Sequence, residues 1–221
     1  VKRAQFQLKA LLMVLGAALL LVLSRGGVLK ALPGLTLFVI FGVYLWSNLR
    51  DAKSGMAENR EARHKGRTVS RRQMAEKLFL FVLGITAIVA GSQLLINYGS
   101  ELALLMGVPA SIIGVTMVAV GTSLPELVTT LTAIAKKEAS MSVGNIIGAN
   151  VIDLTMILPV CSAVSGGALT IGAQTTLLDM PACLLLCCVA VIPPLVTERF
   201  YRWQGVLMLG LYAGYVVLLV T

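Results

Sequence analysis

Two short polar runs interrupt apolar stretches of this 221-residue chain and carry its candidate chemistry. The first run contains Thr122, Ser123 and Glu126, which a helix would place on one face because they lie three or four positions apart. The second run contains Asn145 and Asp153, eight positions apart and therefore also on one helix face. Hydroxyl, amide and carboxylate oxygens are the ligands that hard cations such as Ca²⁺ prefer. The two runs together predict a cation site.

Proline and glycine residues within these runs predict local irregularity and close packing. Pro125 has no backbone N–H, so the Gly121 carbonyl loses its helical partner and we expect a kink that exposes this oxygen. Gly144 and Gly148 form a small-xxx-small pair, which lets two helix backbones approach closely. Both features favour a site to which two helices contribute ligands, although each alone is also typical of ordinary helix packing.

The two acidic residues would be costly in a membrane. An ionised carboxylate at the centre of a lipid-facing helix costs about 2.5–3.5 kcal/mol even on the lenient insertion scale. Glu126 and Asp153 therefore need a cation, a proton or water. Gln93 and Asn97, four positions apart in the preceding apolar run, either contact the site or bond across helices. Asp179 is either a helix-start carboxylate or a functional one.

The composition indicates an integral membrane protein built of helices. Hydrophobic residues make up 57% of the chain and charged residues 13%, against roughly 25% charged residues in soluble domains. Continuous apolar runs exclude the alternation of a barrel, so we expect an all-α, polytopic transmembrane bundle of about seven spans. The expected spans are 10–23, 32–46, 78–97, 109–135, 141–164, 175–196 and 203–220.

The charge distribution predicts the orientation. Nine of the eighteen Lys and Arg residues lie in residues 50–77, without aromatic residues for base stacking, so we expect a cytoplasmic loop and no nucleic-acid partner. Threading the spans alternately places sixteen of the eighteen on that side, with the amino terminus, and leaves the carboxyl terminus outside. The loop can also contact anionic lipid, and the sequence leaves open whether it is a surface helix or disordered.

Two motifs resemble those of a known family. The stretch "GTSLPE" at 121–126 and the stretch "GNIIGAN" at 144–150 resemble the signature repeat of the cation/Ca²⁺ exchanger superfamily, the sodium/calcium exchanger membrane region. The resemblance implies two inverted halves of five helices with broken helices at the site. On this basis residues 78–221 are the second half with its signature repeat. Residues 1–49 are two segments that resemble the end of the first half, and residues 50–77 are the cytoplasmic loop between them.

The resemblance also implies residue roles. Glu126 would be the main calcium ligand of this half, Asp153 its acidic counterpart, and Thr122 and Ser123 would offer oxygens to Na⁺. The residues expected around these ligands are Asn145, Asn150, Gly121, Gln93 and Asn97. In one departure from the pattern, alanine replaces the frequent serine at position 149, which removes a hydroxyl and leaves Na⁺ as the counter-ion open.

The expected function is therefore a secondary antiporter that exchanges Ca²⁺ for Na⁺ or H⁺ by alternating access, in a bacterial plasma membrane and without a resident cofactor. No second GTSLPE-like run occurs, so this chain would supply half of the ion site. We expect a fragment, since the chain begins on "VKRAQFQ" just before a short span, or else a partner chain that supplies the first half. The alternatives are a passive cation channel or pore subunit and a non-transporting scaffold. No nucleophile–base pair or phosphate loop indicates an enzyme.

Overall fold

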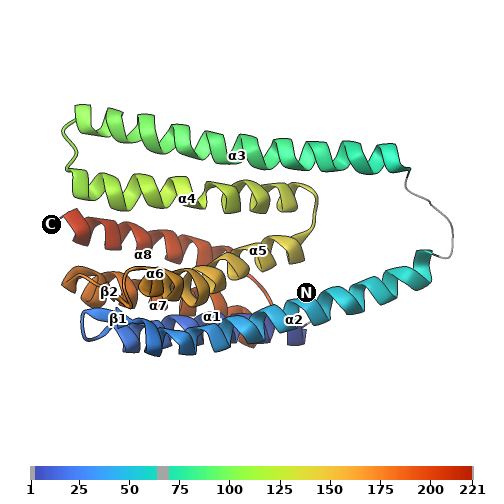
Figure 1. Cartoon of the computed structure of the whole chain (residues 1–221), viewed down its shortest axis with the longest axis horizontal. Coiled ribbons are helices and arrows are strands. Elements are labelled where there is room, and N and C mark those ends of the chain that lie inside the picture. The colour runs from blue at the N-terminus through green and yellow to red at the C-terminus, as the bar shows by residue number, and fades with distance from the viewer. Residues whose placement is uncertain (1–2, 64–69, 221) are drawn as a thin grey trace. The chain divides into compact units, whose positions relative to one another are not determined.

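The computed structural model describes residues 3–63 and 70–220, which fold almost entirely into helices (Figure 1). Within this part of the chain, seven helices are long and apolar enough to cross a membrane, which confirms the all-α fold class and the expected number of spans. The helices are α1 (Arg3–Ser24), α2 (Ala31–Arg63), α3 (Arg71–Leu105), α4 (Ala110–Ala135), α5 (Ala139–Ile152), continued by η1 (Asp153–Ile157) and α6 (Leu158–Val164), then η2 (Thr175–Asp179), continued by α7 (Met180–Thr197), and α8 (Arg202–Val220).

Two of the helices extend beyond the apolar runs into the basic loop. Helix α2 continues to Arg63 and α3 begins at Arg71, so most of the described part of residues 50–77 is helical. Residues 64–69, in the middle of that loop, lie outside the described residues. Both described ends of the loop are thus helical, as extensions of the spans, and the choice between a surface helix and disorder stays open.

The chain divides into two compact units. One unit consists of Val1–Ser54 and Ile146–Thr221, and the other is Gly55–Asn145. Helix α1 and the part of α2 up to Ser54 thus belong to the same unit as residues 146–221, and α1 contacts η1, β1 and α7. The sequence predicts a different division of the chain, at residues 50 and 78, according to the order of the spans. That division stays a prediction.

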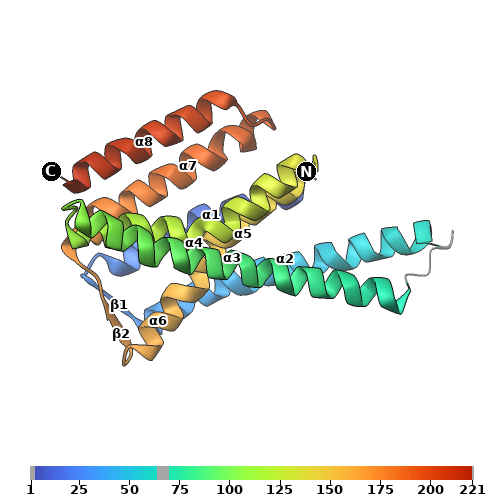
Figure 2. The same cartoon turned by 90° about the horizontal axis from the view of Figure 1, so that it is seen from above.

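In the first unit, a two-stranded sheet joins two loops that are far apart in the sequence (Figure 2). Strand β1 (Val28–Lys30) pairs antiparallel with β2 (Ala168–Thr170), and Leu29, fully buried, lies opposite Leu169. The buried Ser162 hydroxyl donates to the Leu29 carbonyl at 2.6 Å. Four spans separate the two strands, so their pairing requires both loops to lie on one side of the membrane. Alternate crossing of the membrane by the seven predicted spans also places these two loops on one side.

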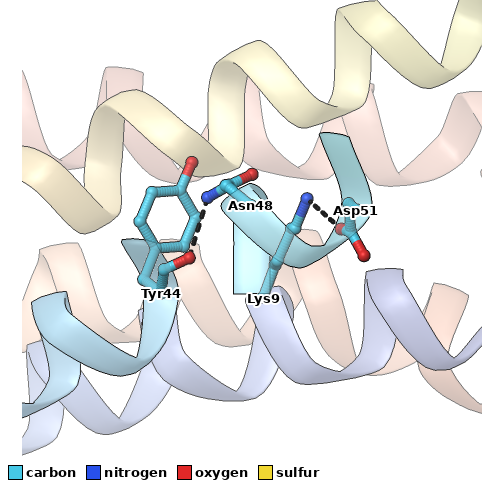
Figure 3. A network of polar contacts seen from close by, with 4 residues as sticks. All are labelled: Lys9, Tyr44, Asn48 and Asp51. Carbon is cyan, nitrogen blue, oxygen red and sulfur yellow. Dashed lines mark hydrogen bonds and ion pairs between the residues drawn. The ribbon is translucent and has the colours of Figure 1, made fainter. Parts of the chain in front are cut away.

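The other end of this unit carries a second set of contacts (Figure 3). Lys9 Nζ of α1 lies 3.0 Å from Asp51 Oδ2 of α2, with both side chains about one-fifth to one-quarter exposed. The rings of Phe6, at the start of α1, and Phe200, between α7 and α8, meet edge to face at 5.7 Å. These segments therefore share one side, as the charge distribution predicts. That this side is the cytoplasm stays a prediction.

Prolines account for two widened helical turns in this unit. In η1 the Leu158 N–H donates to the Asp153 carbonyl, and in η2 the Met180 N–H donates to the Thr175 carbonyl, both five residues back. Pro159 and Pro181 come next in the chain. A proline ring clashes with the carbonyl four residues earlier and offers no N–H, and a π-helical turn relieves that clash. Irregular helix geometry thus occurs where Asp153 and Asp179 lie.

In the second unit, α3 and α4 form an antiparallel hairpin (Figure 1). The chain turns at Gly107, whose φ of +80° favours glycine. A Cβ on Gly121 of α4 would lie 2.1 Å from Ile96 Cγ1 of α3, so only glycine allows this approach. A Cβ on Gly99 would lie 3.3 Å from Met117 Sδ. The hairpin is therefore held by small residues on both helices.

Candidate cation site

The side chain of Glu126, in the middle of α4, is partly buried and has one oxygen without a donor. Its Oε2 is buried and has no hydrogen-bond partner among the described residues. Nearly all buried polar atoms in proteins are hydrogen-bonded, because an unpaired one costs free energy. A proton or a cation on this carboxylate would remove that cost. The oxygen therefore fits the cation site that the sequence predicts.

Asn145, near the start of α5, holds the main chain at Glu126. Its Nδ2 lies 3.2 Å from the Glu126 carbonyl oxygen, 2.8 Å from Thr129 Oγ1 and 3.2 Å from Thr130 Oγ1. A carbonyl oxygen only accepts hydrogen bonds, so the NH₂ group must face α4. The amide oxygen of Asn145 therefore faces away from the Glu126 carbonyl, with its lone pairs available to a donor or a cation.

The two hydroxyl residues of the signature lie on exposed positions of α4. Thr122 Oγ1 donates within its own helix, to the carbonyl oxygens of Val118 at 2.9 Å and Ala119 at 3.2 Å. A donating hydroxyl keeps its lone pairs, so it can still bind a cation. Ser123 is exposed beside it. Both are thus compatible with ion ligation, and their assignment as ligands stays a prediction.

Gly121 and Pro125, where the sequence predicts a kink, both lie inside helix α4. The helix runs without interruption from Ala110 to Ala135. The Pro125 carbonyl accepts from Thr129 Oγ1 at 2.9 Å. Gly121 provides the close approach to Ile96 of α3 described above. The role of the Gly121 carbonyl as a ligand stays a prediction.

Gln93 and Asn97 lie on α3 next to the face that packs against α4. Ser92 is buried and Ile96 contacts Gly121, and each amide residue follows one of these by a single position. Both amides are exposed, and within the described residues neither is hydrogen-bonded to Glu126. The structure therefore places them on the rim of the α3–α4 contact, and a role near the ion stays a prediction.

Asp153 lies in the other unit, on the first residue of η1. Its side chain is exposed, whereas Thr155, two residues later, is fully buried and bonds to the Val151 carbonyl. A Cβ on Gly16 of α1 would lie 2.8 Å from Thr155 Cγ2. Helix α1 thus packs closely against the widened turn that carries Asp153. Sequence reasoning missed Gly16 and Thr155, because a glycine within an apolar run gives no signal of its partner.

The remaining motif residues of α5 have local roles. Asn150 Nδ2 donates to the Ile146 carbonyl of its own helix at 2.9 Å. A Cβ on Gly148 would lie 2.6 Å from the Tyr44 hydroxyl of α2, which points toward α5 in Figure 3. No heavy atom of the described residues lies within 4 Å of the corresponding point on Gly144. Of the glycine pair, only Gly148 is closely approached, and by a tyrosine side chain.

The ligand chemistry that these residues offer is mainly neutral. Glu126 and Asp153 belong to different units, so their convergence on one ion stays a prediction. Among the described residues, no three His, Cys, Asp or Glu side chains gather into a metal-binding group. A cation here would therefore use hydroxyl, amide and main-chain oxygens beside a small number of carboxylates, as hard cations accept.

Among the described residues, seven long apolar helices, some with polar side chains inside the spans, define a multi-pass membrane protein. The family model described as "Sodium/calcium exchanger protein" matches residues 76–221. That match covers more than half of the chain and includes both polar runs. The chain belongs to the sodium/calcium exchanger protein family.

Several curated proteins are similar to the chain. An uncharacterized membrane protein of Methanocaldococcus jannaschii is 30% identical over 187 residues, which is 82% of this chain and 55% of the relative. Sodium/calcium exchanger MaX1 of Methanosarcina acetivorans is 32% identical over 145 residues, 66% of this chain and 41% of the relative. Human sodium/potassium/calcium exchanger 1 is 34% identical over 92 residues, 41% of this chain and 8% of the relative.

The chain thus spans about half the length of the first two relatives. No solved structure is significantly similar to it.

Proposed function

We propose that this chain supplies part of the ion site of a secondary antiporter, which exchanges Ca²⁺ for Na⁺ or H⁺ by alternating access. The observation that carries this proposal is the buried Glu126 Oε2, which has no hydrogen-bond partner among the described residues, at the middle of an apolar helix. The family membership supports the same class of cargo. In this proposal Ca²⁺ is the substrate, and Glu126 is its main ligand.

Electrostatics supplies the coupling. Glu126 and Asp153 together would neutralise one Ca²⁺, with Thr122, Ser123 and the Asn145 amide adding oxygen ligands. When Ca²⁺ leaves, two unscreened carboxylates in a medium of low dielectric constant repel each other and lose solvation. Na⁺ or protons must then neutralise the site before it reorients, so an empty charged site does not cross the membrane. Broken helices at mid-membrane depth are the expected architecture for such a step.

Ala149 bears on the choice of counter-ion. It lies on α5 between Asn145 and Asp153, one helical turn from each. A serine at this position would offer a hydroxyl to Na⁺, whereas alanine offers none. A proton needs only a carboxylate oxygen, so the substitution affects Na⁺ binding more than H⁺ binding. Ala149→Ser is therefore expected to raise the Na⁺ affinity and leave H⁺-driven exchange unchanged.

The other ligands of the site would come from a second signature repeat, on another segment or a partner chain. Polar side chains on the exposed surfaces of α3 and α4 are suited to meet such a partner. Their exposure within an apolar span would be unfavourable against lipid. These exposed residues are Gln93, Asn97, Thr122 and Ser123.

The test is Ca²⁺ uptake by proteoliposomes that contain the transport-competent assembly. We expect uptake that depends on an outward Na⁺ or H⁺ gradient, is lost in Glu126→Gln, and is retained in Glu101→Gln, the same chemical change on an exposed residue of α3. A passive channel would conduct Ca²⁺ without either gradient. A scaffold would neither transport nor bind Ca²⁺. Normal uptake by Glu126→Gln would remove the main support for the proposal.

A further inference from the structure

Asp179 is a further carboxylate within a membrane span and is not part of the proposed ion site. It is the last residue of η2, within the candidate span Thr175–Thr197. The helix that contains it begins at Ala173, so Asp179 lies beyond the first turn. Stabilisation of a carboxylate by the helix dipole falls off within that turn. A helix-start role therefore does not account for its position.

The partner of Asp179 is a tyrosine on the neighbouring helix. Tyr215 Oη of α8 donates to Asp179 Oδ1 at 3.1 Å, and both side chains are partly buried. Among the described residues this hydroxyl is the only hydrogen-bond partner of the carboxylate, and no Lys, Arg or His forms an ion pair with it. Helices α7 and α8 run side by side here (Figure 2).

Within the described part of the chain, the other groups around the pair bring no compensating positive charge. From α8, Tyr212 packs with its ring 6.1 Å from that of Tyr215, and from α7 Cys183 lies one turn beyond Asp179. From α1, the Ser24 hydroxyl contacts Met180 Sδ at 2.8 Å. The cations of the loop that carries β1, Arg25 and Lys30, are exposed.

A neutral partner has a different consequence from a charged one. Lys9 Nζ, 3.0 Å from Asp51 Oδ2, gives that carboxylate an oppositely charged partner. The hydroxyl of Tyr215 can donate to a carboxylate or accept from a carboxylic acid, so its bond survives either state. An ionisable side chain inside a membrane span marks a path for protons or ions more often than a packing role.

We propose that Asp179 and Tyr215 form a proton-binding site, distinct from the site of Glu126 and Asp153. The Asp179 carboxylate takes one proton and becomes a carboxylic acid, while Tyr215 stays neutral and keeps its hydrogen bond. One carboxylate and one phenol are too few ligands for Ca²⁺, which takes six to eight oxygens. The site lies on the side of the membrane that carries β1 and β2, since η2 follows β2 directly. It does not depend on the transport proposal.

The test is infrared difference spectroscopy of the full chain in lipid nanodiscs, between acidic and alkaline buffers. We expect the carbonyl-stretch band of a carboxylic acid in acidic buffer, lost on alkalinisation. The band should be absent in Asp179→Asn and should move to higher frequency in Tyr215→Phe, because a hydrogen bond to the acid is lost. Asp51→Asn, Glu126→Gln and Tyr212→Phe should each leave it unchanged.

Two results would overturn the proposal. One is an acid band that persists in Asp179→Asn and disappears in Glu126→Gln, which would assign the titrating group to the ion site instead. The other is that Asp179→Asn removes no carboxylic-acid band from the wild-type spectrum, which would show that Asp179 stays ionised and solvated. Tyr215→Phe keeps the test decisive if Asp179→Asn does not fold, because an unmoved band in that variant also contradicts the proposed pair.

Discussion

The Nδ2 atom of Asn145 on α5 lies 3.2 Å from the main-chain oxygen of Glu126 on α4, and 2.8 Å from Thr129 Oγ1. One amide thus ties α5 to α4 at the residue whose Oε2 lacks a hydrogen-bond partner among the described residues. The main chain at Glu126 is consequently held from both helices.

Replacing Asn145 with Leu should destabilise the contact between α4 and α5 by about 1–2 kcal/mol, because the Glu126 carbonyl and two threonine hydroxyls lose a donor. The measurement is thermal unfolding in nanodiscs, together with Ca²⁺ binding, which should weaken. Thr132→Val is the matched control, since among the described residues its hydroxyl bonds only to the Val128 carbonyl of its own helix. Equal losses in both variants would contradict a specific role for Asn145.

Gly121→Ala should destabilise the α3–α4 hairpin by about 1–3 kcal/mol through overpacking, because the new Cβ would lie 2.1 Å from Ile96 Cγ1. Ile96→Ala removes the clashing atoms, so the double variant should lose less stability than the sum of the single variants. Gly114→Ala on the same helix, with open space at its Cβ, is the control and should be tolerated. Additive losses in chemical or thermal unfolding would show that the two residues do not meet.

Gly16→Ala should displace η1, because its Cβ would lie 2.8 Å from the methyl group of the fully buried Thr155. We expect roughly tenfold weaker Ca²⁺ binding, as is typical when a group that positions a ligand is moved. Thr155→Ser removes that methyl group and keeps the hydroxyl, so it should restore binding in the double variant. Gly34→Ala, with an ordinary contact of 3.7 Å to Pro159, is the control. Failure of the rescue would argue against positioning of Asp153 through α1.

The Lys9–Asp51 ion pair should contribute about 1 kcal/mol, since both side chains are partly exposed and such pairs are weak. Lys9→Met should lower the unfolding temperature by a small amount that shrinks as salt is added. The charge exchange Lys9→Asp with Asp51→Lys should recover part of the loss. A loss that does not respond to salt would show that packing, rather than charge, joins α1 and α2 here.

The spans could be predicted from the sequence because hydrocarbon thickness imposes long apolar runs that a single chain shows directly. The strands β1 and β2 could not, since each has three residues and their pairing depends on the packing of distant helices. The widened turns η1 and η2 left a signal in Pro159 and Pro181, two residues beyond each turn, that could have been used.

In the candidate site, too, some features could be predicted from the sequence and others could not. Side-chain types and spacing indicate Glu126, Asn145 and Asp153 from the motif alone. The partners of Gly121 and Gly16 are residues on other helices, and no local pattern names them. A glycine in an apolar run predicts flexibility and close helix approach equally well. Only the three-dimensional packing shows that Gly121 lies against Ile96 and Gly16 against Thr155.

The most direct measurement of the central claim is a double-mutant cycle on Ca²⁺ affinity in the transport-competent assembly, with Glu126→Gln, Asp153→Asn and both together. If the two carboxylates bind one ion, each single variant should lose at least about tenfold in affinity, and the combined loss should depart from the sum of the two. Single losses that add without coupling, or an affinity that neither substitution changes, would contradict a shared calcium site.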